Sequence, residues 1–327
     1  MKKKESQSKL AGRFKGSNNT SLFILLFIIL LGAVLSIVSE NFLTAYNIGV
    51  IVRQMSFVGM AALAQTLVLI TIGTDLSVGT TACLANILFA IFATSGGLPA
   101  PIAIILSLII CMVIGLCSGM LITKLKLSPF IVTLGISEIS TGAVLVITQG
   151  VTVTGLEGPV LQLGAGMLGP VPVPTLIFIG FALIMAYVMK YTPFGREIYA
   201  IGGNANAARL VGIKVDRNTC MVFSISAALA AIGGILMACR YSSGQPNIGE
   251  TWRMNSITAA VVGGTSMTGG SGSMLGTVIG ALLITQLSNA IVILNISQYW
   301  EKVVTGGVVL LAVAIDALRS RAAQAAK

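Results

Sequence analysis

Two carboxylates within apolar sequence are the residues of this chain best suited to chemistry inside a membrane. Asp75 and Glu138 each lie in a long hydrophobic stretch. A charge at the centre of a span costs about 2.5–3.5 kcal/mol on insertion scales, so such residues usually line a cavity or bind a partner. Thr74 and Ser77 add hydroxyls beside Asp75. We therefore expect Thr74, Asp75, Ser77 and Glu138 to line a path for a polar solute.

Both carboxylates also have a structural interpretation. Asp75 follows a break in the apolar sequence at Gly73, so it can instead lie at the cytoplasmic water boundary and cap the next helix. Glu138 lies close to Ser137 and Ser140, whose hydroxyls can bind its carboxylate. The residues by themselves leave both interpretations open.

The composition argues against an enzyme or a metal protein. The chain has no histidine, which removes the commonest general base and metal ligand. Its five cysteines are odd in number, lie in or beside apolar spans and show no CxxC spacing. They are Cys83, Cys111, Cys117, Cys220 and Cys239. We expect no catalytic residue, no metal site and no cofactor in this chain.

A glycine-rich segment, GTSMTGGS at 264–271, has the spacing of a phosphate-binding P-loop. Gly270 stands where the lysine that binds the β and γ phosphates should be. We expect close backbone packing or a re-entrant turn at this segment. If the protein uses ATP and magnesium, another chain must bind them.

The longest stretch that a bilayer would reject is the connector Tyr191–Arg217. Pro193-Phe194-Gly195 is typical of a turn. Asn204 is placed to cap a short helix, and Gly212 suits the left-handed position that ends one. The connector is also rich in cations, which indicates the cytoplasmic side. A capped basic helix is suited to docking on a cytoplasmic partner, although an ordinary connecting loop remains open.

A second polar segment, Arg240–Arg253, is predicted to lie on the outer side of the membrane. Its aromatic and amide side chains suit a docking surface for an extracytoplasmic protein or an interfacial belt of Tyr and Trp. The candidate docking residues are Tyr241, Gln245, Asn247 and Trp252.

These residues belong to a polytopic membrane protein. Hydrophobic residues make up 55% of the chain and charged residues 9%, whereas soluble domains carry roughly a quarter charged residues. We predict an all-α fold of about ten transmembrane helices of about 20 residues each. The predicted spans are 22–38, 48–72, 76–94, 100–123, 129–148, 174–189, 220–239, 256–262, 274–293 and 303–317.

The distribution of cations supports this count. With both termini cytoplasmic, only four of the 20 Lys and Arg lie outside the inner face: Arg53, Arg240, Arg253 and Lys302. No aromatic residues interleave with the cations, so the net charge of +10 does not indicate nucleic-acid binding. Five spans in each half is an odd number, which would make the halves inverted relative to each other, with broken helices.

The chain divides into one membrane domain and two short ends. We expect residues 1–20 to form a basic cytoplasmic leader, 21–318 a single transmembrane domain with a cytoplasmic loop at 190–217, and 319–327 a cytoplasmic tail. The first apolar stretch is longer than the 7–15 residues of a signal peptide and no A-x-A site follows, so we expect an uncleaved span.

Four long segments resemble the permease subunits of ribose-type ABC sugar importers. They are VRQMSFVGMAALAQTLVLITIGTDLSVG, SPFIVTLG, TPFGREIYAIGGNANAARLVGIKV and AAVVGGTSMTGGSGSMLGTVIGALLI. The resemblance runs from about residue 41 to 316. It implies a coupling loop that docks on a cytoplasmic ABC ATPase through Gly195, Arg196, Gly202, Gly203, Asn204, Ala207, Ala208 and Gly212.

The same resemblance implies the setting. A second permease copy or paralogue, an extracytoplasmic sugar-binding protein and an ATPase that binds ATP and magnesium would complete the importer. Its place would be the bacterial cytoplasmic membrane, with the chain crossing the lipid bilayer several times. No nucleic-acid partner is expected.

The chain departs from the family's pattern at three places. The family commonly has an acidic residue on either side of a Leu where this chain has Arg253-Met254-Asn255, basic residues at Ser271 and Ser273, and a Gly at Ile72. These changes leave the solute open between a sugar, a nucleoside and another small polar metabolite. An ion-coupled secondary transporter is a further alternative, although it would need more titratable groups within the membrane than Asp75 and Glu138 provide.

Overall fold

The structure is a computed structural model that describes residues 24–297 and 299–325; the predicted leader at 1–20 lies outside the described residues. The described chain is mostly helical. Its helices are Ile24–Val38, α2 Ala45–Ile70, α3 Val78–Ala93, α4 Ala100–Lys124, α5 Pro129–Thr148, α6 Gln162–Ala165, α7 Val173–Tyr191, α8 Pro193–Gly203, α9 Ala205–Leu210, α10 Val215–Tyr241, α11 Trp252–Val262, α12 Met274–Ile293 and α13 Tyr299–Ala325.

Each predicted span overlaps a helix, so the polytopic all-α prediction is confirmed at this level. Within the described residues, six helices are long and apolar enough to cross a membrane: α2, α4, α5, α7, α10 and α12. Ile24–Val38 and α3 are apolar but shorter. Helix α13 continues to Ala325, so the described part of the predicted tail is helical.

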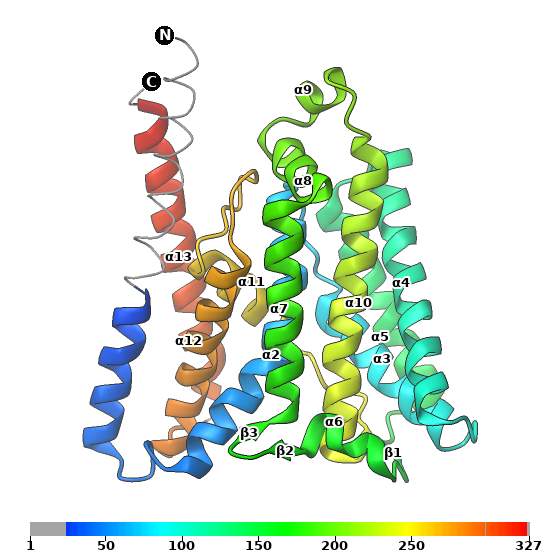
Figure 1. Ribbon diagram of the computed structural model, residues 1–327, viewed down its shortest axis with the longest axis vertical. Helices are drawn as coiled ribbons and strands as arrows, with labels where there is room; N and C mark the ends of the chain where they lie inside the picture. Colours follow the sequence, from blue (N-terminus) through cyan, green and yellow to red (C-terminus); the bar gives the residue numbers. More distant parts are fainter. Residues whose placement is uncertain (1–23, 298, 326–327) are drawn as a thin grey trace.

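The two ends of the helical bundle differ in structure. Helices α8 and α9 lie at one end, together with the glycine-rich loop 263–273 (Figure 1). The opposite end carries α6 and short strands from the 149–173 loop (Figure 1). Strand β1 (Val153–Thr154) pairs with β4 (Ser243–Gly244), and β2 (Met167–Leu168) pairs with β3 (Val171–Pro172).

Helix α10 is the centre of the packing and lies against α2, α3 and α4. Large aromatic side chains fill the core around it, including the fully buried Phe57, Phe178 and Phe223. Small residues let the backbones approach closely, as is usual between membrane helices. A Cβ atom at Gly234 of α10 would lie 1.9 Å from the carbonyl oxygen of Ala82 on α3.

Two non-helical segments enter this bundle, 71–77 before α3 and 242–251 before α11. The second corrects our placement of all of Arg240–Arg253 on the outer side: Arg240 and Tyr241 end α10, but the residues from Gln245 onward enter the bundle. It follows α3 inward: the Gln245 amide donates to Asn86 Oδ1 at 2.7 Å, and Cys83 Sγ donates to the Pro246 carbonyl at 3.2 Å. Helix α3 therefore supplies hydrogen-bond partners for the backbone at Gln245 and Pro246.

The inner end of this segment lies against the start of α3. Gly249 packs on Gly79, where a Cβ atom would lie 2.4 Å from the Gly79 carbonyl oxygen. Helix α11 therefore begins inside the bundle. Trp252 is only 2% exposed, and Arg253, which we assigned to the outer side, lies in the first turn of this internal helix.

We predict that Gly234→Ala destabilises the protein by about 1–3 kcal/mol, because overpacking forces the α3 and α10 backbones apart. Gly180→Ala on α7 is the matched control, since no atom lies within 4 Å of its added Cβ. Thermal unfolding in detergent measures both variants. An equal melting temperature for the two variants would contradict the close packing of α3 on α10.

Candidate functional site

The connector between α7 and α10 contains two helices. The first, α8, begins at Pro193, and Thr192 caps it by accepting a hydrogen bond from the Gly195 amide at 3.3 Å. Our prediction of a turn at Pro193-Phe194-Gly195 is therefore wrong. Proline at the first helical position is favoured because its missing N–H is one that the helix would leave unpaired. Pro193 after Thr192 was therefore a helix-start pattern visible in the sequence, which we interpreted as a turn.

The second helix, α9, confirms the predicted caps. The Asn204 side chain accepts a hydrogen bond from the Ala207 amide at 3.0 Å. Gly212 follows the helix with φ +85°, a conformation that favours glycine. The connector is therefore a folded helix pair, and local sequence accounts for both of its caps.

Backbone contacts hold α8 against the inner end of α2. A Cβ atom at Gly202 would lie 1.7 Å from the Ile70 carbonyl oxygen. That oxygen also accepts a hydrogen bond from the Gly270 amide at 2.9 Å. The glycine-rich loop thus joins α8 to α2, which agrees with the expected close backbone packing.

A side-chain hydrogen bond joins α8 to the same loop. The Tyr199 hydroxyl donates to the Gly272 carbonyl at 2.9 Å. Burial raises the pKa of Tyr199, so its hydroxyl keeps the donated proton at neutral pH. Sequence reasoning missed Tyr199, because nothing in the chain near Tyr199 indicates that Gly272 would be its neighbour.

The eight predicted coupling residues fall into two groups. Gly195, Gly202 and Ala208 are buried in contacts with the bundle or within the connector. The exposed group is Arg196, Gly203, Asn204, Ala207 and Gly212. Beside that group, Leu210 is 89% exposed and Val211 is 77% exposed. One face of the connector is therefore fixed to the bundle, and the other presents apolar and cationic side chains.

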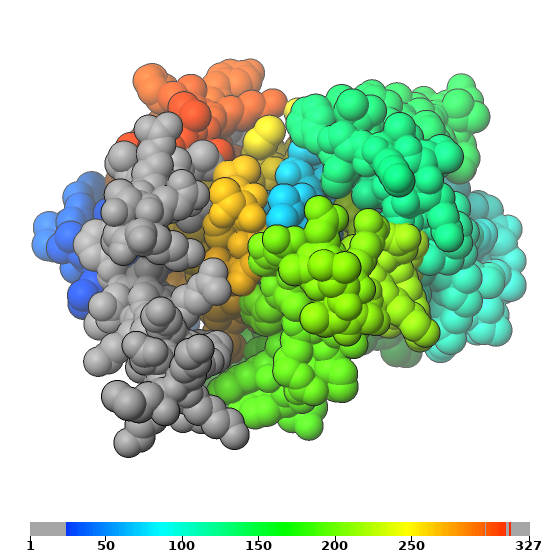
Figure 2. Space-filling model, turned by 90° about the horizontal axis from the view of Figure 1, so that it is seen from above, coloured from blue at the N-terminus to red at the C-terminus, as the bar shows by residue number. Residues whose placement is uncertain are grey.

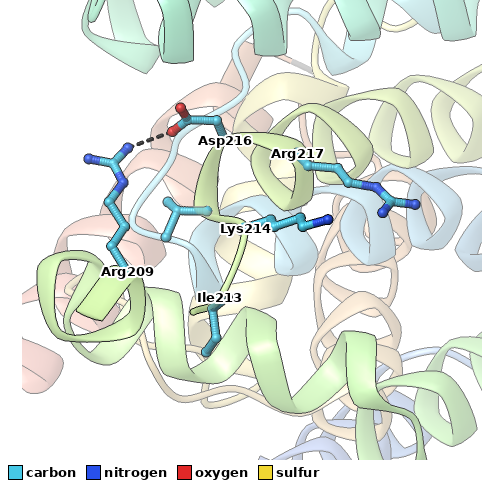
Figure 3. A pocket seen from close by; sticks show the side chains of 6 residues that line it. Arg209, Ile213, Lys214, Asp216 and Arg217 are labelled. Atoms are coloured by element: carbon cyan, nitrogen blue, oxygen red, sulfur yellow. Dashed lines mark hydrogen bonds and ion pairs between the residues drawn. The ribbon is translucent and has the colours of Figure 1, made fainter. Parts of the chain in front are cut away.

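Two shallow cavities lie where α9 meets α10. The first, of about 300 Å³, is lined by the side chains of Arg209, Lys214 and Arg217, among others (Figure 3). Arg209 forms an ion pair with Asp216 across its edge. Both side chains are about half exposed, so water screens the pair and it adds little stability.

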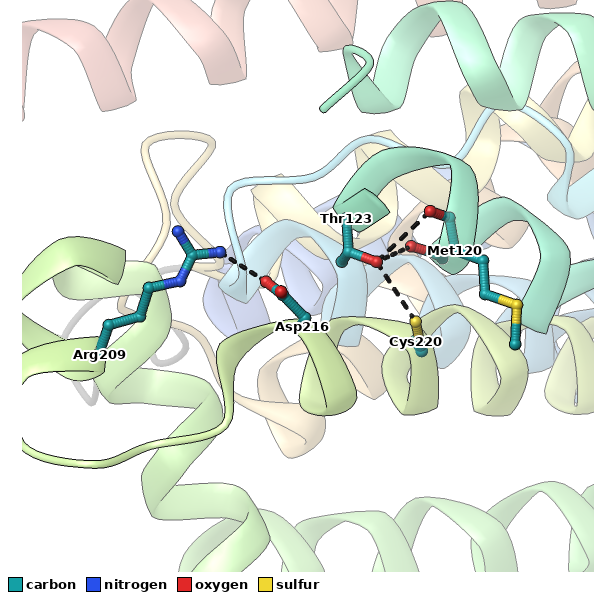
Figure 4. A network of polar contacts seen from close by, with 6 residues as sticks. Met120, Thr123, Arg209, Asp216 and Cys220 are labelled. Atoms are coloured by element: carbon teal, nitrogen blue, oxygen red, sulfur yellow. Dashed lines mark hydrogen bonds and ion pairs between the residues drawn. The ribbon is translucent and has the colours of Figure 1, made fainter. Parts of the chain in front are cut away.

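The second cavity, of about 340 Å³, extends from this ion pair to the segment 71–77 and the α4–α5 turn. Thr123 lies beside it, and its hydroxyl contacts Cys220 Sγ at 3.6 Å and donates to the Gly119 carbonyl at 2.8 Å (Figure 4). The contact with Cys220 joins the end of α4 to α10 next to the connector, whereas the bond to Gly119 lies within α4.

Asp75 is the buried centre of the segment 71–77, with only 3% of its surface exposed. Its Oδ1 accepts from the Ser77 amide at 2.9 Å and the Ser77 hydroxyl at 2.6 Å, and its Oδ2 accepts from the Ser226 hydroxyl at 2.8 Å. The carboxylate thus binds Ser77, the residue before α3, and it leaves the first amides of the helix without a side-chain cap. It lies inside the bundle rather than at the water boundary that one interpretation expected.

The other predicted path residues lie on either side of this centre. Thr74 is partly exposed, and its carbonyl accepts from Thr133 Oγ1 at 3.1 Å. Glu138 on α5 is exposed, and it has no hydrogen-bond partner within the described residues. The expected binding of Glu138 to neighbouring hydroxyls is therefore absent from the described structure. Thr74 and Glu138 are accessible, whereas Asp75 and Ser77 are enclosed.

The residues predicted to dock on an extracytoplasmic protein also include both accessible and buried side chains. Tyr241 and Asn247 are exposed, and Gln245 is partly buried. Trp252 packs in the core beside Gly233 and is absent from the surface. Its position is a correction to our expectation of a surface aromatic.

Comparison with known proteins places the chain among transport permeases. The family model described as branched-chain amino acid transport system / permease component matches residues 47–313. The ribose import permease protein of Bacillus subtilis is 40% identical over 91% of this chain and 92% of its own length. That of Haemophilus influenzae is 35% identical over 97% of this chain and 98% of its own.

A third relative has another sugar in its name. The D-allose transport system permease protein of Escherichia coli is 34% identical over 92% of both chains. No solved structure matches the chain. Because the family model covers most of the chain and these relatives align over nearly all of it, the chain belongs to this family of transport-system permease components.

Proposed function

We propose that the chain is the transmembrane permease subunit of an ATP-driven ABC importer for a monosaccharide or a closely related polar solute. The family is one of transport permeases rather than enzymes, and the relatives above are named for ribose and allose. The observation that carries the proposal is the connector α8–α9. One of its faces is fixed to the bundle and the other is presented to a partner.

The fixed face supplies a mechanical route into the membrane. Ile70 is the last residue of α2, and its carbonyl oxygen is held by the glycine-rich loop and covered by Gly202 of α8. The segment that contains Asp75 begins at the next residue. A partner that moves α8 would therefore shift both the end of α2 and this segment, and would favour one of two conformations of the bundle.

The exposed face would bind a cytoplasmic ABC ATPase, with Arg196, Asn204 and Leu210 among its contacts. That ATPase would bind ATP and magnesium, for which this chain has no P-loop lysine. A second permease copy or paralogue and an extracytoplasmic binding protein complete the importer. Tyr241, which is exposed at the last residue of α10, is a candidate contact for the binding protein. Asn247 is also exposed but lies deeper along α3, so its proposed contact would require access to the interior of the bundle. The protein would reside in a bacterial cytoplasmic membrane.

The arrangement of the helices supports ten spans with both termini cytoplasmic. In one half, α2 is followed by the segment 71–77 and then α3; in the other, α10 is followed by the segment 242–251 and then α11. The helices α2 and α10 cross in opposite directions in this scheme, which makes the halves inverted. The permease domain extends over 21–318, with 190–217 as its coupling loop and 319–327 as its tail.

The solute path would pass the segment 71–77. Thr74 and Glu138 supply accessible polar groups, and Asp75 and Ser77 hold the start of α3 in place. In this scheme Asp75 has a structural role beside the path. Its hydrogen bonds to Ser77 and Ser226 hold the start of α3 next to α10.

We predict that Gly202→Ala uncouples transport from ATP hydrolysis, because the added methyl group would displace α8 from the Ile70 carbonyl. Stimulation of the ATPase by solute-loaded binding protein should fall at least about fivefold, the lower range of typical coupling free energies. The measurement is ATPase activity and uptake by the complete complex in proteoliposomes. Gly203→Ala is the control, since its Cβ would meet nothing within 4 Å. Equal coupling in both variants would argue against this route.

We further predict that a cysteine at Thr74 reacts with a polar thiol reagent in at least one state of the transport cycle. Thr74 is partly exposed in a segment that would move with α2. The exposed Cys117 is first replaced by alanine to remove background. Ser107→Cys, which is fully buried on α4, serves as the unreactive control. Protection of the Thr74 cysteine with and without ATP would exclude this segment from the path.

A further inference from the structure

Basic side chains gather where the connector enters α10, and the first cavity lies among them. Three cations line this cavity of about 300 Å³: Arg209, Lys214 and Arg217. Its lining also includes the carboxylate of Asp216, which is paired with Arg209. Figure 3 shows Lys214 and Arg217 extending together, away from this ion pair. The cavity therefore has two cations that its own carboxylate does not neutralise.

These two cations, Lys214 and Arg217, have no counter-charge within residues 24–297 and 299–325. Both side chains are exposed, and neither forms an ion pair or a hydrogen bond there. Glu197 of α8 also lies against the start of α10, but it accepts a hydrogen bond from Asn218 at 2.6 Å. Residues three apart are neighbours on a helix surface, so the two positive charges act on the same space. Such a pair attracts an anion.

The line along which α4 packs on α10 starts beside these cations. The backbones meet closely there, since a Cβ atom at Gly119 would lie 2.5 Å from the Cα atom of Cys220. On one side of this line, Ile122 of α4 and Thr219 of α10 line the second cavity. Figure 2 shows this end of the molecule, with the connector and the start of α10 in yellow-green next to the α4–α5 turn in green-blue.

The opposite side of this line is an exposed methionine seam, formed by Met120 of α4 and Met221 of α10. Each methionine is two residues from a residue that lines the second cavity, and residues two apart point about 200° apart around a helix. Met120 is 46% exposed and Met221 is 37% exposed. Figure 4 shows the Met120 side chain extending toward α10. Lys124 and Arg217 lie four residues further toward the connector, on the same faces of their helices, and both are exposed.

A phospholipid matches both parts of this surface. Basic pockets between transmembrane helices on the cytoplasmic side bind anionic lipid headgroups. Methionine side chains are flexible and polarisable, so they adapt to an irregular apolar partner such as an acyl chain. A free anion would contact the cations and leave the methionine seam uncovered. The combination of cations with an adjoining apolar seam therefore favours a lipid over a soluble anion.

We propose that the junction of the connector with α4 and α10 binds an anionic phospholipid of the inner leaflet. Lys214 and Arg217 bind the phosphate, and one acyl chain lies along Met120 and Met221. The inference rests on the proposed importer function, in which the end with α8 and α9 is cytoplasmic. The bound lipid joins the connector to α4, beside the cavity that reaches the segment 71–77.

The test compares two photoactivatable lipids with identical acyl chains, phosphatidylglycerol and phosphatidylcholine. Each is added in trace amount to phosphatidylcholine nanodiscs that hold the complete complex with its ATPase. Mass spectrometry then quantifies the crosslinks on peptides from 112–124 and 214–224. We expect the anionic probe to label these peptides at least about fivefold more than the neutral one, the factor expected for a single cation near a membrane surface.

Variants of the two cations assign this preference to the site. The double replacement Lys214→Gln with Arg217→Gln should abolish it, whereas Lys214→Arg with Arg217→Lys should retain it because both charges remain. Lys190→Gln is the matched control, since it removes another exposed cation from the end of α7. It should leave the preference unchanged.

Soluble sn-glycerol 1-phosphate separates a lipid site from a site for a free anion, and at millimolar concentration it should not displace the anionic probe. Equal labelling by the two probes, a preference that survives the loss of both cations, or displacement by glycerol phosphate would each overturn the proposal. Lipid labelling requires neither transport nor ATP, and the coupling of Gly202→Ala tests the importer function separately. An uncoupled Gly202→Ala complex without lipid preference would therefore reject the lipid site alone.

Discussion

Backbone groups that leave a helix inside an apolar bundle must find hydrogen-bond partners within it, and much of this structure follows from that constraint. The segment 242–251 obtains partners from Asn86 and Cys83 of α3. The segment 71–77 obtains them from Thr133 of α5, which binds the Thr74 carbonyl and the Leu76 amide. Within the same segment, Asp75 accepts a hydrogen bond from the Ser77 amide. Polar residues of apolar helices therefore bind the backbone at both breaks, and the breaks allow α3 and α11 to begin inside the helical bundle.

The same constraint links the end of the bundle that carries α8 and α9 to its interior. At the end of α2, the Ile70 carbonyl is satisfied by the Gly270 amide of another loop, and α8 approaches closely enough that Gly202 needs to lack a side chain. Gly202 of α8 and Gly270 of the glycine-rich loop therefore both contact the Ile70 carbonyl of α2, although the three segments are distant in sequence. The residues after Ile70 enter the bundle and carry Asp75. A movement of the connector therefore reaches the buried carboxylate through a few covalent and hydrogen bonds.

Helix breaks also leave helix ends within the apolar region, and the two ends at this junction are treated differently. Asp75 lies beside the start of α3 and accepts from the amide and hydroxyl of Ser77, whereas the first turn of α11 contains Arg253 and no acidic residue. An uncompensated charge in a medium of low dielectric constant is costly, so it is retained when a ligand or partner supplies the opposite charge.

The sequence by itself determined the class of protein, the helical spans, both caps of α9 and the basic connector, because these depend on composition and on residues within a few positions of one another. Asn204 and Gly212 are examples, since each acts on the backbone next to it. Only the tertiary structure decided that Arg253 is internal, that Trp252 is buried, and that Tyr199 reaches Gly272. Those outcomes depend on where the segment 242–251 and the glycine-rich loop find their partners. A hydropathy pattern predicts that a polar segment containing glycine and proline is exposed. Neighbouring helices can nevertheless bury such a segment by providing hydrogen-bond partners for its backbone amides and carbonyls.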